Sequence, residues 1–425
     1  MRITLKSNLA RRAVMALAIA TFLAAVVWIS KAYWAYRVAQ EPSVRNSARA
    51  VKLDPGNADY HLRLGRFYQY SITDMDPERA IDHFRQAAHL SPHDSRPWLE
   101  LAATLQLQRK AAEAEACLRR ADFLAPNIPS VQWAIGNFYL LGGDVDEAFR
   151  HFRAVLAGTS EYSQVLFSIA WKASGDADKI LSELIPHRIP TEFGYLYYLV
   201  SQDRYPEAQS VWKRILSNAE TFRPTQAAGY IDSLIRARRP VEAHQVWTDL
   251  LRRGLLKATY ENSARNLITN GGFEEDLLKM GFDWRIASVE GAFAGLDRTT
   301  FHSPGNALLI QFSGKQNVHY RHVFQYVRVM PGRRYRLQGF MKAEGITTDS
   351  GPRLEVRDAY DPGVLRVLSE GITGTTPGWT SASLDFATGP KTELIVVSVT
   401  RLPSRKLDNL IAGRVWVDDV ILEAL

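Results

Sequence analysis

Apolar side chains recur three and four positions apart through residues 41–260, which is the pattern of helices with one buried face. The pattern has a period of 34 residues, and one position of the repeat is always a small alanine (Ala80, Ala114, Ala148). Four positions later a larger apolar residue follows each alanine (Phe84, Leu118, Phe152). A small residue lets two antiparallel helices approach closely, and a large one fills the gap between them. We therefore predict stacked helical hairpins.

Other residue types recur in the same frame. Gly65 and Tyr68 stand three apart in one repeat, as do Gly136 and Tyr139 in another, and Pro126 ends a second helix. This period and these residue types resemble the tetratricopeptide repeat (TPR) family. The resemblance implies an α-solenoid of five to six helical pairs over residues 41–261, with a groove that binds protein partners. After residue 158 the pattern is weaker, so we expect a degenerate hairpin at 162–187.

Residues 13–30 are 18 consecutive uncharged, mostly apolar residues, a length that suits a membrane-spanning helix. Four basic residues precede this stretch and two follow it. The positive-inside rule then predicts a single-pass protein with its N-terminus in the cytoplasm and its bulk extracytoplasmic, which is periplasmic in a Gram-negative bacterium. We assign residues 1–40 to a cytoplasmic basic tip and transmembrane anchor. A cleaved signal peptide is the alternative, although its apolar run usually has about 7–15 residues.

From residue 262 the helical pattern stops, and apolar and polar residues alternate in short stretches such as 323–329 and 394–399. Turn signals such as Pro331-Gly332 separate these stretches. Short alternating strands with frequent turns predict an antiparallel β-sandwich over residues 262–425. The predicted fold class is therefore multidomain, α plus all-β: a transmembrane helix, an α-solenoid and a C-terminal β-sandwich.

Three stretches of this last part, 266–274, 327–337 and 415–420, together resemble the jelly-roll carbohydrate-binding modules attached to glycoside hydrolases. The resemblance covers nearly all of residues 262–425 and implies a jelly roll. It also implies a structural calcium ion held by Glu274 and Asp418, and calcium does prefer carboxylate and carbonyl oxygens. Alternatively, the two carboxylates accept hydrogen bonds from backbone N–H groups at the strand ends.

A polysaccharide site needs exposed aromatic rings with polar groups beside them. The aromatic candidates, with two arginine neighbours, are Trp284, Tyr320, Tyr326, Tyr360 and Trp379, with Arg353 and Arg357. For each aromatic residue a place in the core is the alternative, and Trp416 could equally face either way.

The net charge of +7 suggests an anionic partner until it is located along the chain. Residues 1–37 carry six Lys/Arg and no acid, residues 38–265 carry 28 basic and 27 acidic side chains, and residues 266–425 carry 18 of each. The surplus therefore flanks the apolar stretch, and no basic segment is left for a phosphate backbone, so we expect no nucleic-acid partner. The single cysteine, Cys117, excludes an intramolecular disulfide.

The sequence contains no nucleophile elbow, phosphate loop or zinc-protease motif. The carboxylate pairs Glu274/Glu275 and Asp418/Asp419 are chain neighbours, which in a strand point to opposite faces rather than toward each other. We therefore expect no enzyme, no catalytic residues and no cofactor apart from the implied calcium. The leading hypothesis is a membrane-anchored scaffold in cell-envelope or exopolysaccharide assembly or export. A pure protein adaptor with a structural sandwich and a glycan-active enzyme are the alternatives.

Overall fold

The structure of the protein, a computed structural model, describes residues 8–263 and 265–425. Two of the basic residues used in the topology prediction, Arg2 and Lys6, lie outside the described residues. The chain divides into two compact units between Thr191 and Glu192, and each unit is described by itself.

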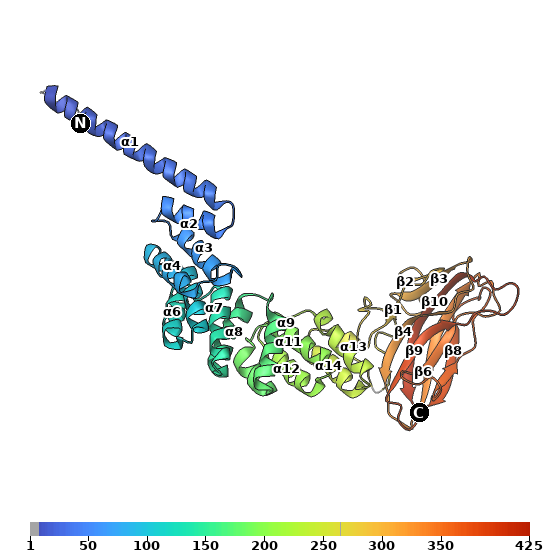
Figure 1. The fold of residues 1–425 in the computed structure, drawn as a ribbon. Coiled ribbons are helices and arrows are strands. Elements are labelled where there is room, and N and C mark those ends of the chain that lie inside the picture. Colours follow the sequence, from blue (N-terminus) through green and yellow to red (C-terminus); the bar gives the residue numbers. More distant parts are fainter. Residues whose placement is uncertain (1–7, 264) are drawn as a thin grey trace. The chain divides into compact units, whose positions relative to one another are not determined.

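From residue 8 onward, all regular secondary structure of the first unit is helical (Figure 1). Its elements are α1 (Asn8–Ala39), α2 (Val44–Leu53), α3 (Ala58–Tyr70), α4 (Pro77–Leu90), α5 (Ser95–Leu107), α6 (Ala111–Leu124), α7 (Pro129–Leu141), α8 (Val145–Gly158), α9 (Ser163–Ser174), α10 (Ala177–Lys179) and a π-helical turn (Ile180–Leu184). Three hairpins, α3–α4, α5–α6 and α7–α8, confirm the three regular repeats. The predicted degenerate hairpin is α9 followed by the very short α10 and the π-helical turn.

The repeats pack as their residue types predicted. Ala80, Ala114 and Ala148 are completely buried. In two repeats a glycine of the first helix lies directly under the aromatic ring of the second: a Cβ added to Gly65 would be 2.5 Å from Phe84 Cε1. In the middle repeat Ala102 takes the place of the glycine and Leu118 the place of the phenylalanine. A larger residue on the first helix is thus matched by a smaller one on the second. The small residue on the first helix therefore makes room for the large residue of the second helix, and this contact is part of the packing that holds each hairpin together.

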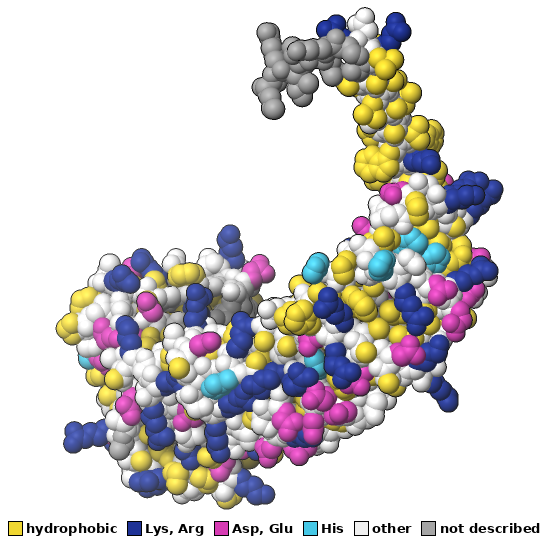
Figure 2. All heavy atoms as spheres, turned by 90° about the vertical axis from the view of Figure 1, so that its left-hand side faces the viewer, with side chains coloured by type: hydrophobic (Ala, Val, Ile, Leu, Met, Phe, Trp, Pro, Cys, Tyr) yellow, Lys and Arg dark blue, Asp and Glu magenta, His cyan; other side chains and the backbone are white. Residues whose placement is uncertain are grey.

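Helix α1 differs from the other helices because most of its apolar residues are exposed, and only its C-terminal end, with the buried Ala35 and Ala39, packs against α2. Its segment from Arg11 to Ala39 is 29 residues long and contains an 18-residue window with a mean hydropathy of 2.3, so it is long and apolar enough to cross a membrane. On the side seen in Figure 2, apolar side chains cover this helix and basic side chains lie at its outer end. By length and composition, a membrane span and a signal sequence both fit this helix.

The second unit contains helices followed by strands. After α11 (Ile189–Ser201), which straddles the division, come α12 (Tyr205–Ser217), α13 (Ala228–Arg236) and α14 (Pro240–Arg252), with short 3₁₀ turns at 224–227 and 258–260. The strands are β1 (Arg285–Ile286), β2 (Ala292–Asp297), β3 (Ala307–Ser313), β4 (Tyr320–Arg328), β5 (Arg334–Glu344), β6 (Arg353–Asp358), β7 (Arg366–Leu368), β8 (Thr380–Ala387), β9 (Leu394–Arg401) and β10 (Ala412–Ala424).

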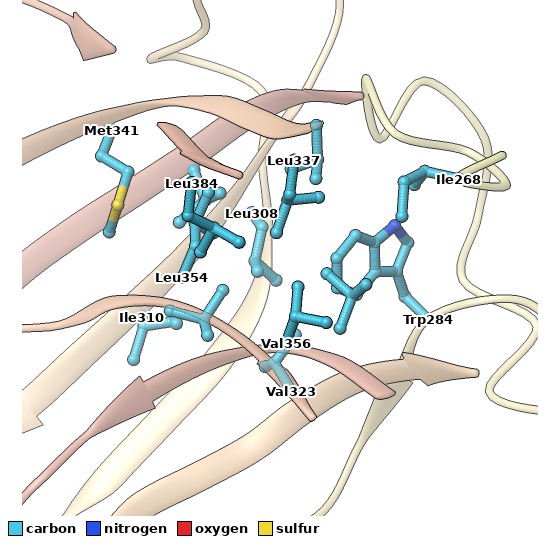
Figure 3. Close-up of a cluster of buried hydrophobic side chains, with 14 of the residues drawn as sticks. Ile268, Trp284, Leu308, Ile310, Val323, Leu337, Met341, Leu354, Val356 and Leu384 are labelled. Carbon is cyan, nitrogen blue, oxygen red and sulfur yellow. The ribbon is translucent and has the colours of Figure 1, made fainter. Parts of the chain in front are cut away.

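The strands form two five-stranded antiparallel sheets, which confirms the predicted sandwich. The first sheet has the order β1-β4-β9-β6-β7 and the second β2-β3-β10-β5-β8. Side chains from both inner faces meet in one apolar core, and Trp284 closes one end of it beside Ile268 (Figure 3). The alternating burial along β5, where every second residue is buried, is the pattern that made these strands recognisable in the sequence.

Helices α13 and α14 pack against the sandwich within the same compact unit. Trp247 of α14 lies against Phe282, with ring centroids 6.2 Å apart, and over Gly281. Asp232 of α13 forms a 2.6 Å ion pair with Arg285 of β1. The hydroxyl of Tyr360 donates a 2.9 Å hydrogen bond to the carbonyl of Ile235. The last hairpin and the sandwich thus share buried apolar and polar contacts.

The packing of α14 against the sandwich predicts that the second unit becomes less stable in acid. His244 of α14 packs edge-on against Phe282, 5.1 Å between centroids, and burial together with Arg328 lowers its pKa to about 4. The unfolded chain takes up this proton near pH 6.5, whereas the folded chain resists it, so stability falls as the pH drops from about 6.5 toward 4. We expect the free energy of unfolding of this unit to fall by about 1 kcal/mol between pH 7.5 and 5.5. Denaturant titrations of the native chain and of His244→Gln check this, because the variant should lose that part of the pH dependence. Equal pH dependence in both proteins would contradict it.

Candidate functional site

Two of the predicted sugar-stacking residues lie in the core of the sandwich. Trp284 is 0% exposed, and its indole N–H donates a 3.1 Å hydrogen bond to the carbonyl of Asn270. Tyr320 is 1% exposed and packs against Phe312. A ring without an exposed face cannot stack on a sugar, so these two residues support the core alternative. The sequence could not separate the two cases, because an inward and an outward aromatic residue look alike in a strand.

Three other candidates in the sheets, Tyr326, Arg353 and Arg357, lie on one face of the sandwich. Val323 and Val327 of β4, and Leu354 and Val356 of β6, point into the core. Because side chains alternate along a strand, their neighbours point outward from the first sheet. We call this surface the arginine-rich face. Its members are Arg285, Phe324, Tyr326, Arg328, Arg353, Glu355, Arg357, Arg366, Leu368, Leu394, Val396, Ser398 and Thr400.

The arginine-rich face carries five arginines and one carboxylate, Glu355. Glu355 is 2% exposed and pairs with Arg366 at 2.7 Å, while Ser398 donates a 3.2 Å hydrogen bond to its other oxygen. Arg285 is neutralised by Asp232. Among the described residues, Arg328, Arg353 and Arg357 have no carboxylate within the ion-pair distance of 4.0 Å. Three positive charges on this face are therefore uncompensated.

Aromatic rings on the arginine-rich face are only partly available. Arg285 lies over the ring of Tyr326, 5.1 Å from its centroid, so one side of that ring is already covered. Phe324 lies one row further along β4, half-buried, with its centroid 5.7 Å from that of Tyr326. Between β4 and β6 the outward side chains of β9, Leu394, Val396, Ser398 and Thr400, are all buried. The accessible atoms of this face therefore belong mainly to the flanking strands, with the aromatic residues on β4 and arginines on β6 and β7.

One end of this face lies under the helices. Tyr360 follows β6 at that end, where it binds the carbonyl of Ile235 and lies under the guanidinium of Arg238, 5.2 Å away. Arg328 of β4 contributes to the lowered pKa of His244 in α14. Arg353, at the other end of β6, and Arg357 are half-buried, and Arg366 is exposed. The end of β6 occupied by Arg353 is therefore the one away from α13.

Trp379 lies apart from these residues, immediately before the strand β8 of the second sheet. Its ring meets His302 edge-on at 5.6 Å, and His302 stacks on Phe340 at 3.8 Å. Nearby charges are paired, for example Arg336 with Asp385 at 2.7 Å and Arg414 with Glu344 at 3.4 Å. Two arginines of the second sheet are therefore paired, and the predicted site residues do not form one cluster.

Glu274 and Asp418, the residues implied to bind calcium, both lie beside the 302–306 segment. Asp418 is 0% exposed, and its side chain accepts hydrogen bonds from the backbone N–H groups of His302, Ser303 and Asp419. Burial raises the pKa of Asp418. The exposed carboxylate of Glu274 lies against Gly305. Among the described residues no group of three or more His, Cys, Asp or Glu side chains has metal-binding geometry. These contacts fit the hydrogen-bonding alternative for Asp418 better than a metal ligand.

The expectation that Asp418 and Asp419 point to opposite faces is wrong. Asp419 binds the same segment as Asp418, with Oδ2 2.6 Å from His302 Nδ1 and Oδ1 accepting from Ser303 Oγ at 2.9 Å. The cause is a bulge: the register of β10 shifts between Asp418 and Ile421, and Asp419 has a φ of 47°. Ser303 donates to the aspartate rather than to His302, so this trio lacks the order of a catalytic triad.

We expect calcium removal to leave this region intact. Because Asp418 already accepts three backbone hydrogen bonds, no ion is needed to satisfy it. Thermal unfolding of the purified chain in EDTA and in millimolar calcium should give midpoints within about 1 °C of each other. A calcium-dependent rise of several degrees that disappears in Glu274→Gln would instead establish the implied metal site.

The repeats of the first unit also expose a regular apolar feature. Tyr70, Leu107 and Leu141 are the last residues of α3, α5 and α7, in equivalent positions of three successive repeats. They are 63%, 77% and 78% exposed. A hollow of about 440 Å³ beside Tyr70 is lined by Arg63, Arg66, Phe67 and Ser71. Exposed apolar residues repeated in this way are typical of protein-contact surfaces. We call these three residues the apolar ridge.

Comparison with known proteins agrees with this architecture. Residues 72–134 match the tetratricopeptide repeat family. A search of curated proteins found no match. Among the solved structures with similarity is the Pseudomonas aeruginosa pilF protein, with 16% identity, a TM-score of 0.26, and coverage of 53% of this chain and 91% of that one. A CBM4 structure has 17% identity, a TM-score of 0.26, and coverage of 37% of this chain and 99% of that one. Another is the bacteriophage CBA120 tailspike protein 4 enzymatically active domain, with 14% identity, a TM-score of 0.25 and coverage of 38% of this chain. The match covers 21% of that protein, so this chain spans about a fifth of its length.

These identities and TM-scores are low, so the architecture rests on the element order and the sheet topology themselves. The repeat period, the buried alanines and the family match agree for the helical part. Two five-stranded antiparallel sheets around one core define the C-terminal part. The chain therefore carries tetratricopeptide repeats followed by a jelly-roll-like β-sandwich.

Proposed function

We propose that this protein is a membrane-anchored, non-enzymatic scaffold that binds protein partners through its repeats and a polysaccharide through its sandwich. In this proposal α1 is an uncleaved anchor, the N-terminus is cytoplasmic and the repeats and sandwich are extracytoplasmic. Tethering would hold a glycan near the proteins that make or move it, which raises their effective concentration. Cell-envelope or exopolysaccharide assembly or export is the setting that fits such a scaffold.

The observation that carries the carbohydrate half is the arginine-rich face. It brings together Tyr326, Arg353 and Arg357, which the sequence analysis named, with Phe324 and three further arginines that the sequence analysis did not single out. Polar groups beside an aromatic ring are what a sugar-binding surface requires. The alternation Arg353-x-Glu355-x-Arg357 was the available signal, because residues two apart in a strand share a face.

The non-enzymatic part of the proposal is supported by the state of the carboxylates. The one carboxylate on the arginine-rich face, Glu355, is buried and paired with Arg366. Asp418 is fully buried and engaged by backbone N–H groups. Glycoside hydrolysis needs two carboxyl groups that face a sugar from opposite sides. Neither residue is placed for that role.

The experiment is affinity electrophoresis of the full-length chain in mild detergent, through native gels that each contain one polysaccharide. The panel should include neutral and anionic polymers. Retardation by at least one of them, reduced in Phe324→Ala but not in the exposed Phe293→Ala of the second sheet, is the expected result. Unchanged mobility of a folded chain in every gel would remove the carbohydrate half of the proposal.

The second candidate function is a pure protein adaptor, and the apolar ridge favours it. Tyr70, Leu107 and Leu141 offer exposed apolar contacts in three consecutive repeats. In this case the sandwich is a structural cap on α13 and α14. The same gels decide between the two candidates, because an adaptor is retarded by no polysaccharide.

A further inference from the structure

We propose that the ligand of the arginine-rich face is an anionic polysaccharide bearing carboxylate groups, bound by Arg353, at the end of that face away from α13, and by Arg357 further along β6. This inference rests on the proposed function and names the chemical class of its ligand. It goes beyond the resemblance to carbohydrate-binding modules, which suggests stacking on aromatic rings and says nothing about charge.

The distribution of charge is the first argument. Residues 266–425 hold 18 basic and 18 acidic side chains, so the sequence shows no surplus in this part of the chain. The fold nevertheless places five arginines and one glutamate on the outer face of the first sheet. On the outer face of the second sheet four basic side chains (Arg334, Arg336, Lys342 and Arg414) are matched in number by four carboxylates (Asp297, Glu344, Asp385 and Glu423), and Arg336 and Arg414 form ion pairs. The two sheets thus differ in charge, although the whole part is neutral.

The state of the individual arginines is the second argument. Within the described part of the chain, Arg353 and Arg357 lack a carboxylate partner within 4.0 Å. The Nε of Arg353 donates only to the carbonyl of Gly351, at 3.3 Å, and its guanidinium lies over Gly371, where a Cβ would be 2.5 Å from Nη2. This side chain is therefore held at the surface by backbone contacts while its charge stays unpaired. An arginine fork matches a carboxylate with two parallel hydrogen bonds.

The aromatic residues give the third argument, because they cannot supply the binding alone. Trp284 and Tyr320 are buried, and Arg285 already covers one side of the Tyr326 ring. Phe324 is the remaining aromatic residue of this face and is half-buried. A neutral sugar that depends on stacking would find one incomplete platform here, whereas a carboxylate would find two unpaired guanidinium groups. The chemistry of the face therefore favours an anionic ligand.

The spacing of the two arginines indicates a polymer. Arg353 and Arg357 are four residues apart on β6 and point the same way, so their Cα atoms are about 13 Å apart. One sugar ring cannot reach both, whereas an extended chain with repeated carboxylates can. Nucleic acid is less suited, because only three uncompensated charges lie on this face and α13 and α14 close one end of it.

The test uses the full-length chain in detergent with two forms of one polymer: polygalacturonate, and the same polymer with its carboxylates methyl-esterified. We expect binding of the acid form only, weakened by raising the salt from 50 to 500 mM. Arg353→Gln and Arg357→Gln should each weaken binding about tenfold, the loss of one charge-assisted contact. Arg334→Gln, an exposed arginine of the second sheet, is the matched control and should change it less than twofold. Circular dichroism melts establish that every variant is folded.

Each remaining outcome has a definite meaning. Binding of the esterified polymer as strong as that of the acid, unaffected by either arginine substitution, overturns the charge inference but keeps the proposed polysaccharide function. Binding of the acid form that Arg334→Gln weakens as much as Arg353→Gln shows nonspecific charge attraction and also overturns the inference. Tighter binding of oligo(dT) or dextran sulfate than of polygalacturonate overturns the assignment to carboxylates. Binding of no glycan removes both proposals.

Discussion

Replacing Trp247 with alanine is expected to lower the free energy of unfolding of the second unit by about 3–5 kcal/mol. The indole is 2% exposed, packs against Phe282 and fills the space above Gly281. Its removal leaves a cavity between α14 and the sandwich that the surrounding residues cannot fill without moving. Hydrogen exchange should report faster opening of α13 and α14 and of the 281–285 segment.

Val241→Ala is the matched control for this prediction. Val241 lies on the same helix but is 45% exposed, so its truncation should cost less than about 0.5 kcal/mol. If both variants unfold at the same denaturant concentration, the last hairpin does not stabilise the sandwich. A fragment that begins at residue 262 should then be as stable as a longer one that keeps α11–α14 whole.

Gly136→Ala is expected to destabilise the first unit by about 2–3 kcal/mol, although alanine in place of glycine normally stabilises a helix interior by about 1 kcal/mol. A Cβ at this position would lie 2.4 Å from Cε1 of the buried Phe152 ring. The ring cannot retreat, because Phe152 is 1% exposed and packed on all sides. A loss of stability would therefore show that overlap with the Phe152 ring dominates, whereas a gain would show that helix propensity dominates.

The middle repeat supplies the rescue for that variant. Ala102 and Leu118 are the natural pair at these positions, so Gly136→Ala combined with Phe152→Leu should recover most of the lost stability. Gly56→Ala is the control, because a Cβ there would meet only Asp54, at 3.9 Å. Thermal melts followed at 222 nm measure all four proteins. A stabilising Gly136→Ala would contradict the predicted overlap.

The helical hairpins were predictable because their packing rule is local. Each repeat buries the same residue types at the same spacing, so Ala80, Ala114 and Ala148 identify the close helix contacts without knowledge of the fold. The weak repeat at 162–187 was equally visible, and its second helix is in fact a short helix and a π-helical turn. In a repeat array each helical hairpin contacts mainly the hairpins next to it in the sequence, so the repeat period alone predicts how the hairpins stack.

The site in the sandwich could be predicted only in part. The sequence indicated strands and proposed Tyr326 and Arg353, which do share a face. It could not show that Trp284 and Tyr320 are buried, because their contacts come from strands distant in the chain. Nor could it show that Asp418 and Asp419 bind one segment, since a bulge in β10 reverses the expected alternation.

The sequence by itself determined the apolar N-terminal helix, the hairpin repeats and the strand content, because each depends on periods of a few residues or on composition. The tertiary structure alone decided which side chains share a surface. Strand order places β6 beside β9 and β7, and so gathers arginines from separate strands on one sheet while their acidic counterparts go elsewhere. Charge summed along a chain is independent of folding, whereas charge on a surface depends on which strands are neighbours, and that is settled by long-range pairing.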